Sequence, residues 1–184
     1  KEINNNKRFV IVCGGGKVCR RYQSALKELN PNSTTDSNDW LGIAATKLNA
    51  ELIKQFFAEL ACKKIILDHN ENILFDKAIL VGAGFEPGHS TDFDTVLFAK
   101  KFNAKKLINL SNIEYLYDQD PKENPNAKKL ENVTWNELIK ILPSEWSPGL
   151  NAPFDPIAAK LAKEYNLEVA IISGDNLNQL PLFI

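Results

Sequence analysis

Short apolar runs alternate with longer segments of helical periodicity along this chain. Residues 8–13 carry an apolar run that ends in three glycines, Gly14 to Gly16. A run that is apolar on both faces is typical of a buried parallel strand. Behind the glycines, apolar residues recur at helical spacing until the polar break at residues 30–33. The pattern predicts a strand, a glycine loop and an amphipathic helix, in that order.

The same alternation continues to the end of the chain. A second helix is predicted from Asp39 to Leu60, with its N-cap between Asp36 and Asp39. The remaining strands are predicted at residues 64–67, 77–81, 106–110 and 168–173, and the remaining helices at 91–102, 134–142 and 155–165. This order predicts an α/β fold, a three-layer αβα sandwich with a mostly parallel sheet.

Composition narrows the class of protein. A length of 184 residues fits one domain, and the longest apolar runs fall far short of the roughly 18 to 20 residues that a membrane span needs. The net charge is -1, with lysines and acidic residues interspersed. No overall positive field is therefore expected to hold nucleic acid. We expect a soluble, single-domain protein over residues 1–184 that binds neither membranes nor nucleic acid and holds anionic ligands locally.

The three cysteines, Cys13, Cys19 and Cys62, are widely spaced and lie within apolar or helical patterns. This arrangement is typical of reduced thiols rather than a disulfide framework, so we expect a cytoplasmic protein. The same spacing gives no metal-binding motif, and no metal-ligating residue is predicted.

The glycine loop is the first candidate site. Glycines leave backbone N–H groups accessible, and the N-terminus of the following helix favours an anion. Arg20, one turn into that helix, has a guanidinium that can hold phosphate oxygens. The alternative is a simple tight turn between strand and helix. The loop has neither the Walker pattern nor the spaced dinucleotide fingerprint, which disfavours P-loop kinases and Rossmann dehydrogenases.

A second polar loop spans residues 84–92 and contains a Pro-Gly turn, a histidine and two hydroxyl residues before a predicted helix. These groups can hold an anion, or Ser90 or Thr91 can be an ordinary N-cap. A third loop, residues 111–121, is suited to a purine or ribose: Tyr117 can flank a base, and Asp120 can accept from a ribose hydroxyl or only form a turn. The aromatic residues Phe56, Phe57, Trp135 and Trp146 are interpreted as packing residues.

Taken in order, these segments resemble the amino acid kinase family, in particular its archaeal-type UMP kinases. The family pattern runs GGG-x-x-x-R-[KR]-Y, D-x-[LI]-G-I-x-x-T-[RK]-x-N-A, PGH-[ST]-TD and [ST]-N-V-D-G-V-Y-x-x-DP. The matching segments are residues 14–22, 39–50, 87–92 and 111–121, followed by 126–129 and 154–160. Six matches in the same order cover nearly the whole chain.

The resemblance implies a kinase that phosphorylates UMP from ATP, with Mg²⁺ bound to the ATP. It implies a UMP site formed by Gly15, Asp39, Phe85, Glu86, Pro87, Gly88, His89, Ser90 and Thr91. It implies ATP contacts from Gly16, Arg20, Ser111, Asn112, Tyr117 and Asp120, and catalytic roles for Arg20 and Asp155. It further implies a homohexamer built as a trimer of dimers.

Phosphoryl transfer suits such a site, because the protein mainly aligns the two substrates and neutralises charge. The sequence also departs from the family pattern. The family's first strand, with its Lys and Gly-Gly-Ser loop, has no match in residues 1–184, so this segment is expected to be missing. Tyr115 replaces a family glycine. These departures keep two alternatives open: a non-catalytic nucleotide-binding or storage protein of this fold, and a related kinase acting on another small phosphate or carboxylate.

Overall fold

The computed structural model describes residues 7–111, 113, 116–119, 124–145 and 152–184. The chain divides into two compact units, Lys1–Phe98 and Ala99–Ile184.

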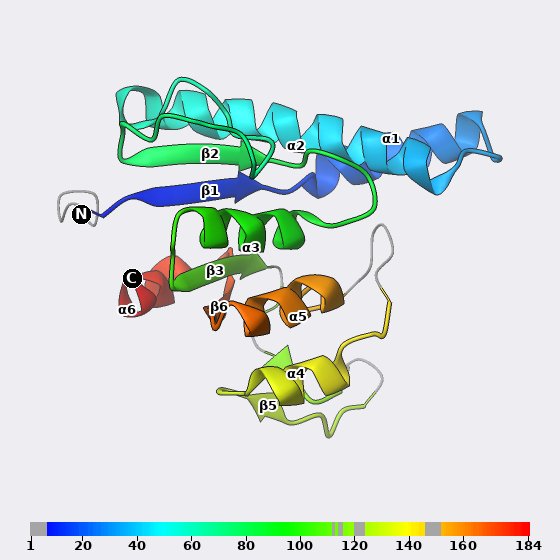
Figure 1. Cartoon of the computed structure of the whole chain (residues 1–184). Helices are drawn as coiled ribbons and strands as arrows, with labels where there is room; N and C mark the ends of the chain where they lie inside the picture. Colours follow the sequence, from blue (N-terminus) through cyan, green and yellow to red (C-terminus); the bar gives the residue numbers. More distant parts are fainter. Residues whose placement is uncertain (1–6, 112, 114–115, 120–123, 146–151) are drawn as a thin grey trace. The chain divides into compact units, whose positions relative to one another are not determined.

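A parallel pair of strands forms the centre of the first unit. Strand β1 (Phe9–Cys13) leads into helix α1 (Gly16–Leu29), then α2 (Thr35–Phe57), the 3-10 turn η2 (Ala58–Leu60) and strand β2 (Ile79–Ala83). Helix α3 (Thr91–Lys101) follows, and its last three residues belong to the second unit. Phe9 lies opposite Ile79, and Cys13 lies opposite Ala83. The carboxyl ends of β1 and β2 therefore meet at one edge, where the two candidate loops begin. Helix α2 runs along this pair (Figure 1).

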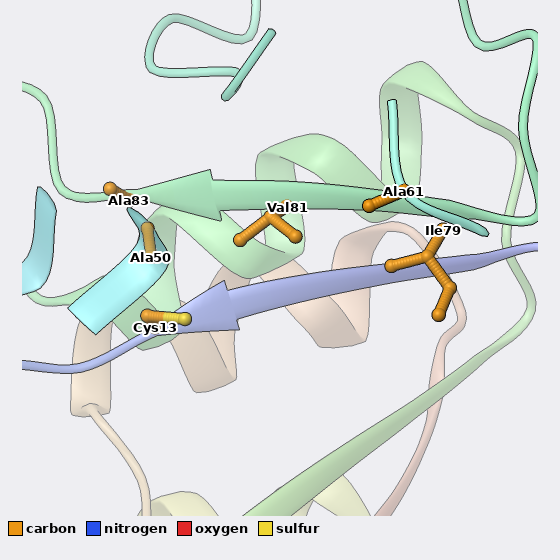
Figure 2. Close-up of a cluster of buried hydrophobic side chains, with 6 residues drawn as sticks. All are labelled: Cys13, Ala50, Ala61, Ile79, Val81 and Ala83. Carbon is orange, nitrogen blue, oxygen red and sulfur yellow. The ribbon is translucent and has the colours of Figure 1, made fainter. Parts of the chain in front are cut away.

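Helices cover both faces of β1 and β2. On one face, Ala50 of α2 joins a buried apolar cluster, drawn in Figure 2, whose members are Cys13, Ala50, Ala61, Ile79, Val81 and Ala83. Gly82 points to the other face, because side chains alternate along a strand. A Cβ at Gly82 would lie 3.1 Å from the ring of Phe98 in α3. This unit thus has a helix–sheet–helix order of its own.

Two sequence predictions in this unit are wrong in detail. Helix α2 begins earlier than predicted. Its N-cap is Thr34, whose hydroxyl accepts from the N–H of Ser37 at 3.1 Å, whereas the predicted N-cap lay between Asp36 and Asp39. The segment around residues 64–67 forms isolated parallel bridges, including Ile66 with Gly82, instead of a full strand. A polar stretch follows closely at residues 68–72, so pairing along β2 stops after these bridges.

The second unit contains another parallel pair. Strand β3 (Lys106–Ser111) pairs in parallel with β6 (Glu168–Ser173), and β4 (Leu116–Tyr117) pairs antiparallel with β5 (Lys129–Leu130). Its helices are α4 (Trp135–Ile141), α5 (Pro156–Glu164), η3 (Leu177–Gln179) and α6 (Leu180–Phe183). The Trp135 indole N–H donates to the Leu167 carbonyl at 3.0 Å, and its ring lies 6.1 Å from that of Phe154. Trp135 is therefore a packing residue, as predicted.

The parallel strand pairs and their covering helices confirm the α/β class. The predicted strands at 8–13, 77–81, 106–110 and 168–173 and the three helices predicted after residue 90 are confirmed within a few residues. Helix α6 and the β4–β5 pair were not predicted. Phe56 is exposed, so its interpretation as a packing residue is wrong; Trp146 lies outside the described residues. Within the described ranges, no helix combines the length and apolar character required to cross a membrane.

Candidate functional site

The glycine loop between β1 and α1 is held in one conformation by its packing. A Cβ at Gly15 would lie 2.5 Å from the Cβ of Cys19, and Gly16 has a φ of +57°, so both positions require glycine. The Asn49 side-chain amide of α2 donates to the carbonyls of Gly14 at 2.7 Å and Gly15 at 3.3 Å. Asn49 therefore fixes the loop against α2.

The loop after β2 is also tied to α2. The Gly84 N–H donates to the Thr46 hydroxyl at 2.9 Å, and that hydroxyl donates to the Ile43 carbonyl at 2.7 Å. Further along, the Gly88 N–H donates to the Asp39 carboxylate at 3.0 Å, and Gly88 has a φ of +100°. A glycine is required for that backbone conformation. Two side chains of α2, Asp39 and Thr46, thus set the path of this loop.

The two loops and the start of α1 come together in the first unit. A Cβ at Gly14 would lie 3.7 Å from the Thr91 hydroxyl oxygen, so the glycine loop reaches the start of α3. Burial raises the pKa of the Cys19 thiol, while Arg20 lowers it and Asp39 raises it through their charges. The structure brings together three separate sequence segments: the glycine loop, Asp39 of α2 and the loop that leads into α3.

His89 has a buried acidic partner. Its Nε2 lies 3.2 Å from the Asp94 carboxylate, and its ring centroid lies 4.7 Å from that of Phe93. Burial raises the pKa of Asp94, and the hydrogen bond from His89 opposes that shift. The Ser90 hydroxyl accepts from the Phe93 N–H at 3.3 Å, so Ser90 does cap α3. Of the other residues named in this loop, Phe85 and Pro87 are half-buried and Glu86 is exposed.

The thiols next to these loops are not activated. Burial raises the pKa of Cys13 to about 11, and the pKa of Cys19 is raised by the same cause. Both thiols therefore stay protonated at neutral pH. Since the thiolate is the nucleophilic form, packing is the role that their environment supports.

The second unit holds the remaining described candidates. Ser111 ends β3 opposite Ser173, and its carbonyl accepts from the Gly174 N–H at 2.8 Å. Tyr117 is half-buried in β4. The buried Asp155 caps α5, because its carboxylate accepts from the N–H groups of Ile157 at 2.6 Å and Ala158 at 2.9 Å. The predictions for Asn112 and Asp120 fall outside the described residues.

Sequence reasoning missed the residues that support these loops. Thr46 and Asn49 were matched as part of a motif and given no role, although each is a polar residue in a helix that packs on the sheet. Asp94 was missed as well. An acidic residue on the core-facing side of a predicted helix is the sequence feature that could have indicated it. No group of three or more His, Cys, Asp or Glu side chains suited to a metal ion occurs in the part of the chain that the structure describes.

Known proteins match this chain along most of its length. The amino acid kinase family pattern matches residues 1–173. Uridylate kinase from Thermococcus sibiricus is 34% identical over 182 residues, covering 97% of this chain and 80% of the relative. Uridylate kinase from Sulfolobus acidocaldarius is 36% identical over 186 residues, again covering 97% of this chain and 80% of the relative.

Solved structures agree with the sequence comparison. The crystal structure of uridylate kinase from Archaeoglobus fulgidus superposes with a TM-score of 0.78 at 30% identity, covering 94% of this chain and 78% of that one. Aspartate kinase from Synechocystis has a TM-score of 0.73 at 16% identity, covering 95% of this chain and 34% of that one, and shows the shared fold alone. The chain therefore belongs to the amino acid kinase family.

Proposed function

We propose that this protein is a uridylate kinase that transfers the γ-phosphoryl group of ATP to UMP, giving UDP for pyrimidine nucleotide synthesis in the cytoplasm. The observation that carries the proposal is the convergence of two loops at the carboxyl edge of β1 and β2. The Asp39–Gly88 hydrogen bond of 3.0 Å joins two of the matched motifs at this edge. The similarity to uridylate kinases from Thermococcus sibiricus and Sulfolobus acidocaldarius supports the choice of substrate.

In this proposal the first unit holds UMP. The acceptor loop, residues 84–91, contacts the base and phosphate together with Gly15, and Asp39 both positions the loop and lies at the nucleoside. Arg20 and the N-terminus of α1, beginning at Gly16, neutralise charge on the transferred phosphoryl group. ATP is assigned to Gly16, Arg20, Ser111, Asn112, Tyr117 and Asp120, with Asp155 close to its phosphates.

The chemistry requires alignment more than acid–base catalysis. The second pKa of a phosphate monoester is about 6, so the attacking UMP oxygen is already ionised near neutral pH. The protein then has to align donor and acceptor and stabilise charge on the transferred group. We propose that Mg²⁺ enters with ATP as part of the substrate, where it would neutralise charge on the phosphates.

The function is tested with the purified chain, ATP, Mg²⁺ and a panel of nucleoside monophosphates. UDP formation is followed by chromatography, and we expect UMP to be the preferred acceptor. Turnover of CMP, AMP or a non-nucleotide phosphate with no turnover of UMP would point to the related-kinase alternative. Stabilisation by UMP and ATP in a thermal shift assay without any UDP would point to a nucleotide-binding protein instead, because a ligand that binds only the native state raises its melting temperature.

A homo-oligomer is the second part of the proposal. Helices α1 and α2 expose large apolar side chains, which on a monomer would stay in water. Three of them on α2, Leu48, Leu52 and Phe56, follow one another at a spacing of four residues and so form a stripe along one side of the helix. The exposed residues are Tyr22, Leu29, Trp40, Leu48, Leu52 and Phe56. We propose that this stripe forms the dimer contact of a hexamer built from three dimers.

The oligomer proposal predicts a change of mass on charge insertion. Leu48→Glu combined with Leu52→Glu places two carboxylates on the stripe, so the dimer contact should be lost. Light scattering after size exclusion should then give a smaller species than the parent, while circular dichroism stays unchanged. A parent that elutes as a monomer, or a double variant of parental mass, would contradict the proposal.

A further inference from the structure

We propose that Asp94 is a positioning residue for the phosphate acceptor: its buried carboxylate holds the His89 ring in one orientation and so sets the affinity of the acceptor loop for UMP. The inference rests on the proposed function, which places UMP at residues 84–91. Asp94 itself lies outside that loop, one turn into α3.

The geometry around His89 holds the ring from two sides. Its Nε2 lies 3.2 Å from Oδ1 of Asp94, with side-chain exposures of 15% for His89 and 6% for Asp94. The Phe93 ring packs against it, with the two planes tilted by 56°. A carboxylate only accepts hydrogen bonds, so the hydrogen of the imidazole must be on Nε2 in this contact. Asp94 thus selects both the orientation and the tautomer of His89.

Burying a carboxylate at this place has a cost in stability. Desolvation is the largest influence on Asp94 and raises its pKa; the hydrogen bond and charge of His89 and the charge of His69 lower it, and Glu86 raises it. A group whose pKa is raised on folding contributes stability at low pH that is lost as the pH rises through the folded value. At neutral pH the charged Asp94 is therefore less favourable for folding than a neutral side chain. The charged Asp94 carboxylate therefore disfavours folding, and its contact with His89 of the acceptor loop points to a role in ligand binding.

The role follows from the charge of the ligand. A phosphate dianion next to His89 favours the doubly protonated ring, in which both nitrogens donate hydrogen bonds. Asp94 then neutralises the positive charge on the buried side of the ring. Without Asp94, the ring loses both its fixed orientation and this compensation, and the loss appears in UMP binding more than in ATP binding.

The kinetic test uses Asp94→Asn, which keeps the shape of the side chain and removes its charge. We expect the KM for UMP to rise about tenfold, with kcat and the KM for ATP within about threefold of the parent. His89→Gln should give a similar defect, and the double variant should be no worse than the single ones, because both changes break one contact. His69→Gln is the matched control, since it removes the other histidine near Asp94, and should leave the KM for UMP unchanged.

A spectroscopic test separates positioning from a general effect on folding. The sequence contains two histidines, so the His69→Gln variant assigns the imidazole signals of His89 by difference. Long-range ¹H–¹⁵N spectra should show hydrogen on Nε2 of His89 in the parent and a mixture of tautomers in Asp94→Asn. At pH 7 the Asn variant should melt no lower than the parent, and its advantage should shrink as the pH falls through the raised pKa of Asp94 toward the ordinary value of a carboxyl group.

The outcomes distinguish this inference from the proposed function. A parent that makes no UDP refutes the proposed function, while the histidine spectra, which need no substrate, still decide whether Asp94 orients His89. If the parent makes UDP, three results would each refute the inference. They are a parental KM for UMP in Asp94→Asn, a defect of Asp94→Asn that adds to that of His89→Gln, and an unchanged His89 tautomer in Asp94→Asn. A lower melting temperature in Asp94→Asn, together with a lower kcat and similar rises in the KM for UMP and the KM for ATP, would identify Asp94 as a purely structural residue.

Discussion

Replacement of Arg20 by alanine is expected to lower kcat/KM roughly 30- to 1000-fold, equivalent to about 2 to 4 kcal/mol of transition-state stabilisation. Arg20 is exposed on α1, one turn behind the glycine loop, and its charge acts on Cys19 next to that loop. A guanidinium there can reach ligand oxygens while its aliphatic stem stays at the surface. The melting temperature should barely change, since no packed group is removed.

A matched control for Arg20→Ala is available on the same helix. Lys27 is an exposed basic residue seven positions further along α1, so it lies on the same face about 10 Å from Arg20. Lys27→Ala should retain parental kcat/KM. If Arg20→Ala and Lys27→Ala both phosphorylated UMP at the parental rate, Arg20 would be an ordinary surface residue and the phosphates would have to lie elsewhere.

Replacement of Asp155 by alanine is expected to reduce the free energy of unfolding by about 2 to 3 kcal/mol. The carboxylate accepts two backbone N–H bonds at the start of α5, and the residue is 4% exposed. Removal of an N-cap costs about 1 kcal/mol, and leaving buried donors without a partner adds a similar or larger amount. Chemical denaturation of the parent and the variant measures the difference.

The variant Asp155→Asn separates capping from catalysis. Asparagine caps helices about as well as aspartate, so its unfolding free energy should stay within about 1 kcal/mol of the parent. If the carboxylate charge also acts near the ATP phosphates, kcat should fall about tenfold or more in this stable variant. Parental kcat in Asp155→Asn would assign the residue to capping alone.

The elements that the sequence predicted best are those with strong hydrophobic patterns. The apolar runs of β1 and β6 and the helical spacing of α3 are read from residues near one another in the chain. The start of α2 was placed too late because Thr34 caps it from a polar stretch without any apolar period. The β4–β5 pair was missed since each strand has two residues, too few for an alternating pattern.

The candidate site could also be predicted only in part from the sequence. Glycines and the Pro-Gly-His loop are visible as motifs, because the backbone conformations they allow are local properties. The side chains of α2 that hold these loops, Thr46 and Asn49, act on distant partners: Asn49 contacts Gly14 across 35 positions and Thr46 contacts Gly84 across 38. Such pairings depend on how α2 packs on the sheet, which no single segment of sequence determines.

The pairing of β1 with β2 also has a consequence for the folding rate. Phe9 and Ile79 are partners although about 70 residues separate them, so the chain must close a long loop before either strand gains its hydrogen bonds. Contacts this distant in sequence slow folding, whereas α1 and α2 form contacts between neighbouring segments. We therefore expect the helical hairpin to form early and the strand pair late. The acceptor loop, which leaves β2, becomes ordered only in that late step.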